Sequence, residues 1–190
     1  MTRLVRPAAE HLAEYADALR RGFEPSTFSG PALAWAQLEA IAHDPAAFLA
    51  GLDDPVGGQV VVLPGGRTVR RLPGFSRWIL DGGFCGVIHF RWQPGVPELP
   101  DYVLGHVGYE VVPWRRGEGQ ATRALGLLLA EVAPLGLPWV EVVTGAANPA
   151  SIRVIEAQGG RLVERFTAGP AQGGAAMLRF RIPLAAPSPA

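Results

Sequence analysis

Hydrophobic positions along the chain follow a helical period near the N-terminus and a strand period further on. Apolar residues recur at helical spacing over residues 8–22 and, less regularly, over 31–50, which predicts two helices. Residues 76–80 and 84–92 alternate on either side of Asp81-Gly82-Gly83, and this pattern predicts a β-hairpin. Further strands are predicted at 2–6, 103–112, 139–143, 161–167 and 177–183, and further helices at 118–133 and 149–158.

The order of these elements indicates the fold class. It implies an α/β fold of the α+β kind, with a central mixed, mostly antiparallel sheet and helices packed on its faces. At 190 residues the chain is long enough for one sizeable core and short for two, so we expect one domain over residues 1–184. Residues 53–74 are rich in glycine and proline and predict an irregular arm or a hairpin, and residues 185–190 predict a disordered tail.

The glycine-rich turn after the strand at 103–112 carries the strongest chemical signal. The strand ends at Pro113, and the chain passes through Gly117 and Gly119 into a helix. Backbone amides at a helix start have no partner inside the helix, and the helix dipole adds positive potential there. The glycines let a ligand approach the backbone, and Arg116 can add a charge-assisted hydrogen bond to a phosphate oxygen. The turn therefore predicts a site for a phosphate or pyrophosphate.

Two other interpretations of this turn stay open. One is an ordinary helix start without a ligand. The other is a dinucleotide-binding fingerprint, since Gly117-x-Gly119 is followed by Glu141 about twenty residues later. The fingerprint fits poorly, because Thr122 takes its third small position and the motif normally opens its domain, whereas here roughly 110 residues precede it.

A second motif narrows the interpretation of the glycine-rich turn. Asn148-Pro149-Ala150-Ser151 opens the last predicted helix, with Asn148 as its N-cap, and Gly159-Gly160 lies past its end. This segment resembles the Asn-x-x-Ala/Ser motif of the GNAT superfamily of N-acetyltransferases. Arg116-Gly117-Glu118-Gly119-Gln120-Ala121 also matches the Arg/Gln-x-x-Gly-x-Gly/Ala pattern of that superfamily, in the expected order. The resemblance covers residues 84–167.

The resemblance implies a cofactor, acetyl-CoA, and the residues that hold it. The turn would bind the pyrophosphate, and the second motif would line the thiol end. The strands at 103–112 and 139–143 would run parallel and splay apart, so that the pantetheine arm enters the splay. The residues assigned in this way to acetyl-CoA are Val111, Val112, Arg116, Gly117, Glu118, Gly119, Gln120, Ala121, Thr122, Asn148 and Ser151. The implied activity is transfer of the acetyl group to a primary amine by direct attack in a ternary complex.

Such a transfer needs a base for the proton of the attacking amine, and two residues are candidates. His106 and Glu110 share one face of the predicted strand under its two-residue period. A neutral imidazole near pH 7 suits His106 to this role, and a hydrogen-bonded structural histidine is its ordinary interpretation. An exposed carboxylate at a strand edge is the ordinary interpretation of Glu110.

The acid that protonates the CoA thiolate is less evident. Many members of the superfamily carry a tyrosine seven residues after the motif asparagine, and this chain has Ile155 there. Ser151 and Tyr109 are the substitutes that we consider, with helix capping and core packing as their ordinary roles. Protonation by solvent, without a side chain, also stays open.

Composition excludes several other classes. All seventeen basic residues are arginines, so Schiff-base, pyridoxal phosphate and P-loop lysine chemistries lack their amine. Cys85 is the single cysteine, which excludes an internal disulfide. No histidine pair shows metal-ligand spacing, and we expect no metal. The formal net charge of zero favours neither nucleic acid nor an anionic membrane as a partner.

The remaining expectations concern location and partners. The N-terminus lacks the apolar run of a signal peptide, and no stretch is long and apolar enough to span a membrane, so we expect a cytoplasmic protein. The bias toward Arg, Ala, Gly and Pro suggests a bacterial genome of high GC content. We expect an amine substrate, either a small molecule or a protein N-terminus, recognised by residues 22–50 and 93–102, and a homodimer stays open. A CoA-binding sensor or assembly module without catalysis is the alternative.

Overall fold

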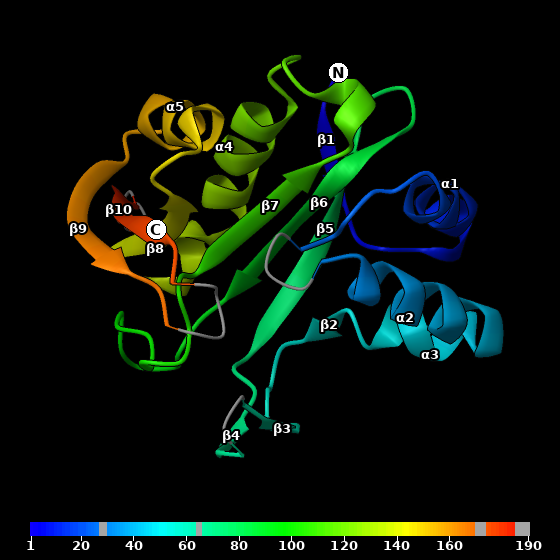
Figure 1. The fold of residues 1–190 in the computed structure, drawn as a ribbon, viewed down its shortest axis with the longest axis horizontal. Coiled ribbons are helices and arrows are strands. Elements are labelled where there is room, and N and C mark those ends of the chain that lie inside the picture. The colour runs from blue at the N-terminus through cyan, green and yellow to red at the C-terminus, as the bar shows by residue number, and fades with distance from the viewer. Residues whose placement is uncertain (27–29, 64–65, 170–173, 185–190) are drawn as a thin grey trace. The chain divides into compact units, whose positions relative to one another are not determined.

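The computed structural model describes residues 1–26, 30–63, 66–169 and 174–184 (Figure 1). The tail predicted at 185–190 lies outside these residues. The chain divides into two compact units made of interleaved segments. The first comprises 1–53, 75–89 and 108–128, and the second comprises the described residues of 54–74, 90–107 and 129–190. Each unit is described by itself below.

The first unit combines the N-terminal helices with the central hairpin. Its elements are β1 (Arg3–Val5), α1 (Ala9–Arg20), α2 (Gly30–His43), α3 (Pro45–Ala50), β2 (Asp53–Asp54), β5 (Gly74–Leu80), β6 (Phe84–Arg91), β7 (Val107–Val111), the 3-10 turn η1 (Pro113–Arg115) and α4 (Gln120–Val132), several of which extend into the second unit. Figure 1 shows α1, α2 and α3 on the same side of β5 and β6.

An aromatic cluster forms the core of the first unit. Tyr15 of α1 stacks on Trp78 of β5 at 4.8 Å between ring centroids and meets Phe84 of β6 edge-on at 5.3 Å. Phe23, which follows α1, packs edge-on against Phe84 at 5.7 Å. All four side chains are buried, so α1 and the hairpin are held together by a large apolar contact.

The helical region expected over residues 31–50 is confirmed, and the chain divides it into two helices, α2 and α3. Asp44 interrupts the helical pattern in an extended conformation and caps α3, and its carboxylate accepts hydrogen bonds from the backbone N–H groups of Ala46 and Ala47 at 3.0 and 2.9 Å. Pro45 has no N–H to donate and takes the first position of α3, where none is needed. The two residues therefore end α2 and begin α3.

The second unit consists of a small hairpin and the C-terminal strands. Its elements are β3 (Val60–Val62), β4 (Thr68–Arg70), η2 (Ala133–Leu135), β8 (Trp139–Gly145), α5 (Pro149–Ala157), β9 (Arg161–Thr167) and β10 (Ala176–Pro183). The β3–β4 pair is a separate two-stranded sheet, which confirms the hairpin predicted within residues 53–74. Strand β10 lies between β8 and β9 and pairs antiparallel with both.

The strand order confirms the predicted mixed sheet. The main sheet runs β1-β5-β6-β7-β8-β10-β9, with β2 paired to β5. Strand β1 pairs antiparallel with β5, and β10 pairs antiparallel with β8 and β9, whereas β7 and β8 pair in parallel at Val107 and Val142. The strand predicted to begin at residue 103 begins at Val107, because the preceding loop turns at Pro100, whose carbonyl accepts the N–H of Val103 at 2.9 Å.

Candidate functional site

The turn between β7 and α4 has the conformation that its glycines predict. Gly117 and Gly119 adopt φ angles of +80° and +75°, a region that favours glycine. A Cβ atom added to Gly117 would meet no atom within 4 Å, so the space beside Gly117 is open, whereas a Cβ atom on Gly119 would lie 2.8 Å from the Nη1 atom of Arg123. Helix α4 begins only at Gln120, two residues later than predicted, because Gly119 lies in the left-handed region. Its first amides therefore begin directly after the open turn.

Arginine side chains surround this turn and are held in place. The exposed Arg116 donates from Nε to the carbonyl oxygen of Val111 at 3.1 Å. Arg115 forms an ion pair with Glu118 at 2.8 Å and donates to the backbone carbonyl of Asp81 at 3.1 Å. The turn thus combines helix amides, a positive dipole end and an oriented guanidinium, and this set of donors fits a pyrophosphate.

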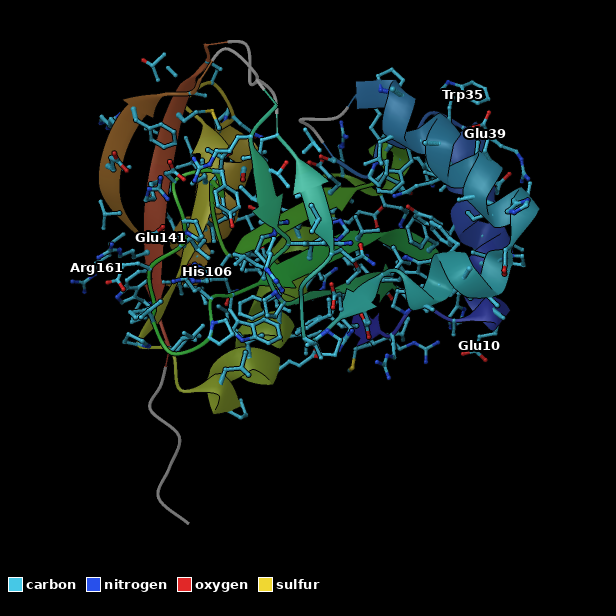
Figure 2. The ribbon with its side chains drawn as sticks, turned by 90° about the horizontal axis from the view of Figure 1, so that it is seen from below. Glu10, Trp35, Glu39, His106, Glu141 and Arg161 are labelled. Atoms are coloured by element: carbon cyan, nitrogen blue, oxygen red, sulfur yellow. The ribbon has the colours of Figure 1, made fainter. Side chains whose placement is uncertain are left out.

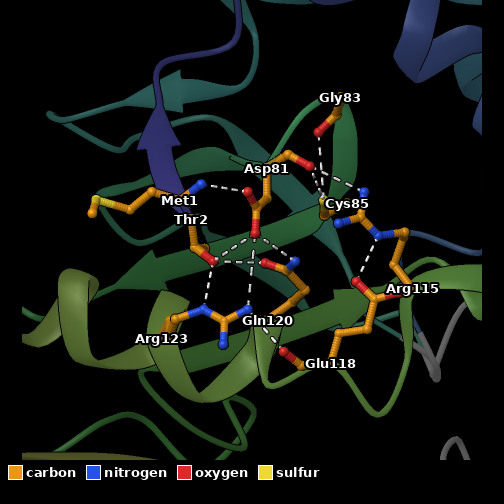
Figure 3. Close-up of polar contacts among 9 residues, drawn as sticks. All are labelled: Met1, Thr2, Asp81, Gly83, Cys85, Arg115, Glu118, Gln120 and Arg123. Carbon is orange, nitrogen blue, oxygen red and sulfur yellow. Dashed lines mark hydrogen bonds and ion pairs between the residues drawn. The ribbon is translucent and has the colours of Figure 1, made fainter.

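Gln120 behaves differently from the other residues of the turn. Its side chain is buried and accepts a hydrogen bond from the hydroxyl of Thr2 at 2.8 Å (Figure 3). Its carboxamide also donates to Asp81 at 3.0 Å. The Gln120 carboxamide is therefore hydrogen-bonded within the protein. The backbone N–H of Gln120, at the first position of α4, is the group of this residue that could face a ligand. Ala121 and Thr122 are half-buried on the same turn of α4.

The backbone at the end of β7 is already hydrogen-bonded. The N–H of Val112 donates to the carbonyl of Cys85 at 2.9 Å, and the carbonyl of Val112 accepts from Arg115 at 3.0 Å. The carbonyl of Val111 accepts from Arg116. A pantetheine arm that pairs with Val111 and Val112 would have to share these carbonyls, each of which has two lone pairs.

The second motif forms the capped helix that its residues predict. The side chain of Asn148 accepts the N–H of Ser151 at 3.1 Å, Pro149 takes the first helical position, and Gly159 follows the helix at a φ of +80°. Asn148 is exposed and Ser151 is half-buried. The predicted caps of this helix are confirmed, and the motif lies entirely in the second unit.

His106 is buried in the second unit, where Figure 2 shows it beside Glu141. Its Nδ1 atom accepts the backbone N–H of Glu141 at 3.0 Å, so the ring proton of the neutral form resides on Nε2. The ring stacks on Phe90 at 6.3 Å and meets Trp139 edge-on at 5.8 Å. Burial lowers the pKa of His106 to about 4, against the opposing charge of the Glu141 carboxylate. The histidine is thus neutral at pH 7, and its one basic lone pair is occupied.

Glu110 and Tyr109 are half-buried on β7 and belong to the first unit. The position of Glu110 depends on a glycine that the sequence analysis did not single out. A Cβ atom on Gly86 of β6 would lie 2.1 Å from the carbonyl oxygen of Glu110, so β6 and β7 approach as closely as they do only because residue 86 is glycine. A glycine inside an otherwise apolar strand was the available signal.

Comparison with known proteins decides the family. Residues 64–161, about half of the chain, match the sequence profile of the acetyltransferase (GNAT) domain. The chain belongs to the GNAT family. No curated protein sequence matches it.

Several solved structures share the fold of this GNAT protein. The Microcin C7 self-immunity acetyltransferase MccE, in complex with acetyl-CoA and AMP, has a TM-score of 0.62 at 13% identity, with 95% of this chain and 91% of MccE covered. The ribosomal L7/L12 α-N-protein acetyltransferase RimL, in complex with CoA, has a TM-score of 0.63 at 12% identity, with 96% and 94% covered. An N-acetyltransferase from Staphylococcus aureus Mu50 has a TM-score of 0.56 at 14% identity, with 97% and 99% covered.

Three further findings on this GNAT protein bear on the expectations from its sequence. Ile155, at the position where the superfamily often has a tyrosine, is fully buried in α5, so no hydroxyl group stands there. Among the described residues, no group of three His, Cys, Asp or Glu side chains comes together in a way that could hold a metal ion. No helix of the described part is long and apolar enough to cross a membrane.

Proposed function

We propose that this GNAT protein is an acetyl-CoA-dependent N-acetyltransferase that acts on a primary amine by direct attack in a ternary complex. The turn at residues 116–122 carries this proposal. Open space in front of Gly117, the start of α4 and the oriented Arg116 together fit a pyrophosphate. MccE with acetyl-CoA and RimL with CoA support an acyl-CoA as the ligand.

Acetyl-CoA would supply an acetyl group that is activated as a thioester. The backbone of Arg116, Gly117, Glu118, Gly119, Gln120, Ala121 and Thr122 would hold its pyrophosphate, with Val111, Val112, Asn148 and Ser151 along its arm. Two of these assignments gain support from their surroundings. Gly117 leaves room for the ligand, and the exposed Asn148 combines a capping oxygen with an amide group that is available for a second contact.

For the base we favour Glu110 over His106. Glu110 is half-buried, and a carboxylate side chain can accept a proton from an ammonium group. His106 would have to break its hydrogen bond with Glu141 before its Nδ1 atom could accept a proton, and its low pKa makes it a weak base. Tyr109 and Ser151 stay candidates for the acid, because both are half-buried and carry a hydroxyl group.

The acceptor is proposed as a class and not as a compound. RimL is described as an α-N-protein acetyltransferase, and a spermidine N-acetyltransferase chimera also shares the fold, at 13% identity and a TM-score of 0.54. Both acceptors are primary amines. On α2 of the present chain, Trp35 and Glu39 are exposed (Figure 2), and an apolar surface with a carboxylate suits an amine that carries an apolar group.

The test combines binding and turnover. Isothermal titration should give an affinity for acetyl-CoA well above those for NADH and ATP, because the pantetheine arm of acetyl-CoA would add contacts at Val111 and Val112 to those of the pyrophosphate. Release of CoA thiol is then followed with a panel of polyamines, amino acid amides and peptides. Equal affinity for all three nucleotides would reduce the turn to a general anion site, and thiol release with an amine would establish the transfer.

The buried Ile155 and the buried neutral His106 favour one second candidate, a CoA-binding module without catalysis. Such a module would bind acetyl-CoA and release no thiol with any amine beyond the rate of spontaneous hydrolysis. The same two measurements therefore separate the enzyme from the sensor or assembly module.

A further inference from the structure

A partly buried polar network joins the proposed cofactor turn to the tip of the β5–β6 hairpin (Figure 3). Asp81, at that tip, accepts hydrogen bonds from the carboxamide of Gln120 at 3.0 Å and from the amino group of Met1 at 2.6 Å. The hydroxyl of Thr2 donates to the carboxamide oxygen of Gln120 at 2.8 Å. Thr2 and Gln120 are both almost fully buried, so the hydrogen bond between them is shielded from water, whereas the bond between Met1 and Asp81 is exposed.

Two arginines extend the network into the turn itself. Arg123 donates to the Thr2 hydroxyl at 2.6 Å, approaches the Asp81 carboxylate at 3.9 Å, and donates to the backbone carbonyl of Glu118 at 2.8 Å. Arg115 donates to the carbonyl of Asp81 and pairs with the Glu118 side chain. The segment between Arg115 and Arg123 is thus tied to Asp81 near both of its ends.

The turn needs such support because of its glycines. Gly117 and Gly119 have no side chains to limit their backbone angles, so the segment would sample many conformations without other restraints. An anion site made of backbone amides binds well only when those amides already point to one place. The network supplies that restraint through the hydrogen bonds of Arg115, Gln120 and Arg123.

We infer that the side chains of Asp81 and Gln120 raise the affinity for acetyl-CoA by holding the 115–123 turn in its binding conformation, and that neither side chain contacts the cofactor. This inference rests on the proposed function. Gln120 keeps its expected place in the cofactor turn through its backbone, and its side chain gains a positioning role.

The charge of Asp81 makes the inference easy to test. Removal of a carboxylate near an anion site should strengthen the binding of an anionic ligand if Coulomb interactions alone mattered. Loss of a positioning group should weaken it. The Asp81→Asn variant therefore gives changes of opposite sign under the two explanations. The Gln120→Met variant changes no charge and removes the groups that bind Asp81 and Thr2.

A control is available on the same hairpin. The Glu14 carboxylate of α1 accepts the N–H of Phe84 at 2.7 Å, so the Glu14→Gln variant removes one acidic group that binds this hairpin without touching the turn. Affinity for acetyl-CoA is measured by isothermal titration at fixed salt and at a temperature at which circular dichroism shows each variant folded. Amide hydrogen exchange of residues 119–122 is followed in the same samples.

We expect Asp81→Asn and Gln120→Met to weaken acetyl-CoA binding by about tenfold, as for one lost hydrogen bond to a charged group, and to speed the amide exchange. Glu14→Gln should bind like the wild type. Unchanged or tighter binding by either network variant would overturn the inference, and Gln120→Met decides alone if Asp81→Asn does not fold. A wild-type protein that fails to bind acetyl-CoA would instead overturn the proposed function.

Discussion

At the scale of single residues, Gly117 and His106 differ in what they offer to a ligand or a substrate. Gly117 has no Cβ, and this absence permits a φ of +80° and leaves the space beside Gly117 open. In neutral His106 the Nε2 atom carries the proton, and the basic lone pair on Nδ1 accepts the backbone N–H of Glu141. The first feature favours a ligand, and the second weighs against a catalytic base.

Gly117→Val is predicted to reduce both stability and binding. A β-branched residue at positive φ costs about 1–3 kcal/mol, and its side chain would occupy the space proposed for the pyrophosphate. Gly136→Val is the control, because Gly136 has a φ of +71° and equally open surroundings at the end of η2. Urea denaturation should show a similar loss of stability in both variants, and titration should show lower acetyl-CoA affinity only for Gly117→Val. Equal affinities in the two variants would remove the turn from the site.

His106→Ala is predicted to be a stability defect. It leaves the N–H of Glu141 unpaired inside the protein, which alone costs about 1–3 kcal/mol of unfolding free energy. His106→Asn should recover part of that loss, because the asparagine oxygen can accept the same N–H. Both variants should keep the acidic limb of the pH profile of turnover, whereas Glu110→Gln should lose it. If the histidine variants keep wild-type stability and lose about a hundredfold in turnover, His106 is the base.

At the scale of elements, caps and turns define where the helices of the site begin. Helix α5 begins at Pro149 under its Asn148 cap, and α3 begins at Pro45 under its Asp44 cap. Both caps are local hydrogen bonds between a side chain and a backbone N–H two or three residues later. The two helices therefore provide a comparison between a cap proposed to serve a ligand and a cap that serves only its helix.

Asn148→Asp should keep the cap of α5, since an aspartate oxygen accepts the N–H of Ser151 equally well. It replaces the amide group that we propose as a contact for the cofactor arm, and acetyl-CoA affinity should fall while the melting temperature stays close to that of the wild type. Asp44→Ala should lower the unfolding free energy by about 1 kcal/mol with unchanged affinity. Unaltered affinity in Asn148→Asp would leave Asn148 a capping residue and nothing more.

At the scale of the whole molecule, the pH dependence of stability reports two groups with lowered pKa values. The pKa of His106 is about 4, against an ordinary value of 6.5, so the unfolded state binds more protons than the folded state between these values. The pKa of Asp81 is about 2, against 3.8, because of its hydrogen bonds with the Met1 amino group and with Gln120. In both cases the contribution to the unfolding free energy is fully present at a pH above the ordinary pKa of the group, and it is lost as the pH falls toward the lowered pKa.

The unfolding free energy should therefore decrease on acidification in two separate ranges. From pH 6.5 to 4 the decrease includes a contribution from His106, and from about pH 4 to 2 it includes one from Asp81. Chemical denaturation at a series of pH values measures both contributions. His106→Asn should flatten the upper range only, and Asp81→Asn the lower range only. A wild-type curve that rises on acidification between pH 6.5 and 4 would contradict the burial of His106 as a neutral group.

Features that depend on neighbouring residues could be predicted from the order of residues alone. The β5–β6 hairpin around Asp81, the open turn at Gly117 and the Asn148 cap were all predicted, and the structure confirms each of them. A glycine at positive φ, a proline at a helix start and a side-chain cap each involve residues a few positions apart, so a short stretch of sequence includes every partner of the interaction. For the same reason both motifs of the GNAT family could be read directly.

Contacts between residues that are distant in sequence determine which polar side chains are buried. Gln120 lies in a motif of cofactor contacts, yet its carboxamide meets Thr2 across 118 positions of the chain and Asp81 across 39. His106 appeared to be available on a strand face, and Phe90, Trp139 and Glu141 enclose it from other strands. Burial and desolvation arise from residues that are distant in sequence, and no local pattern records them. The turn was therefore predictable, and the roles of Gln120 and His106 were not.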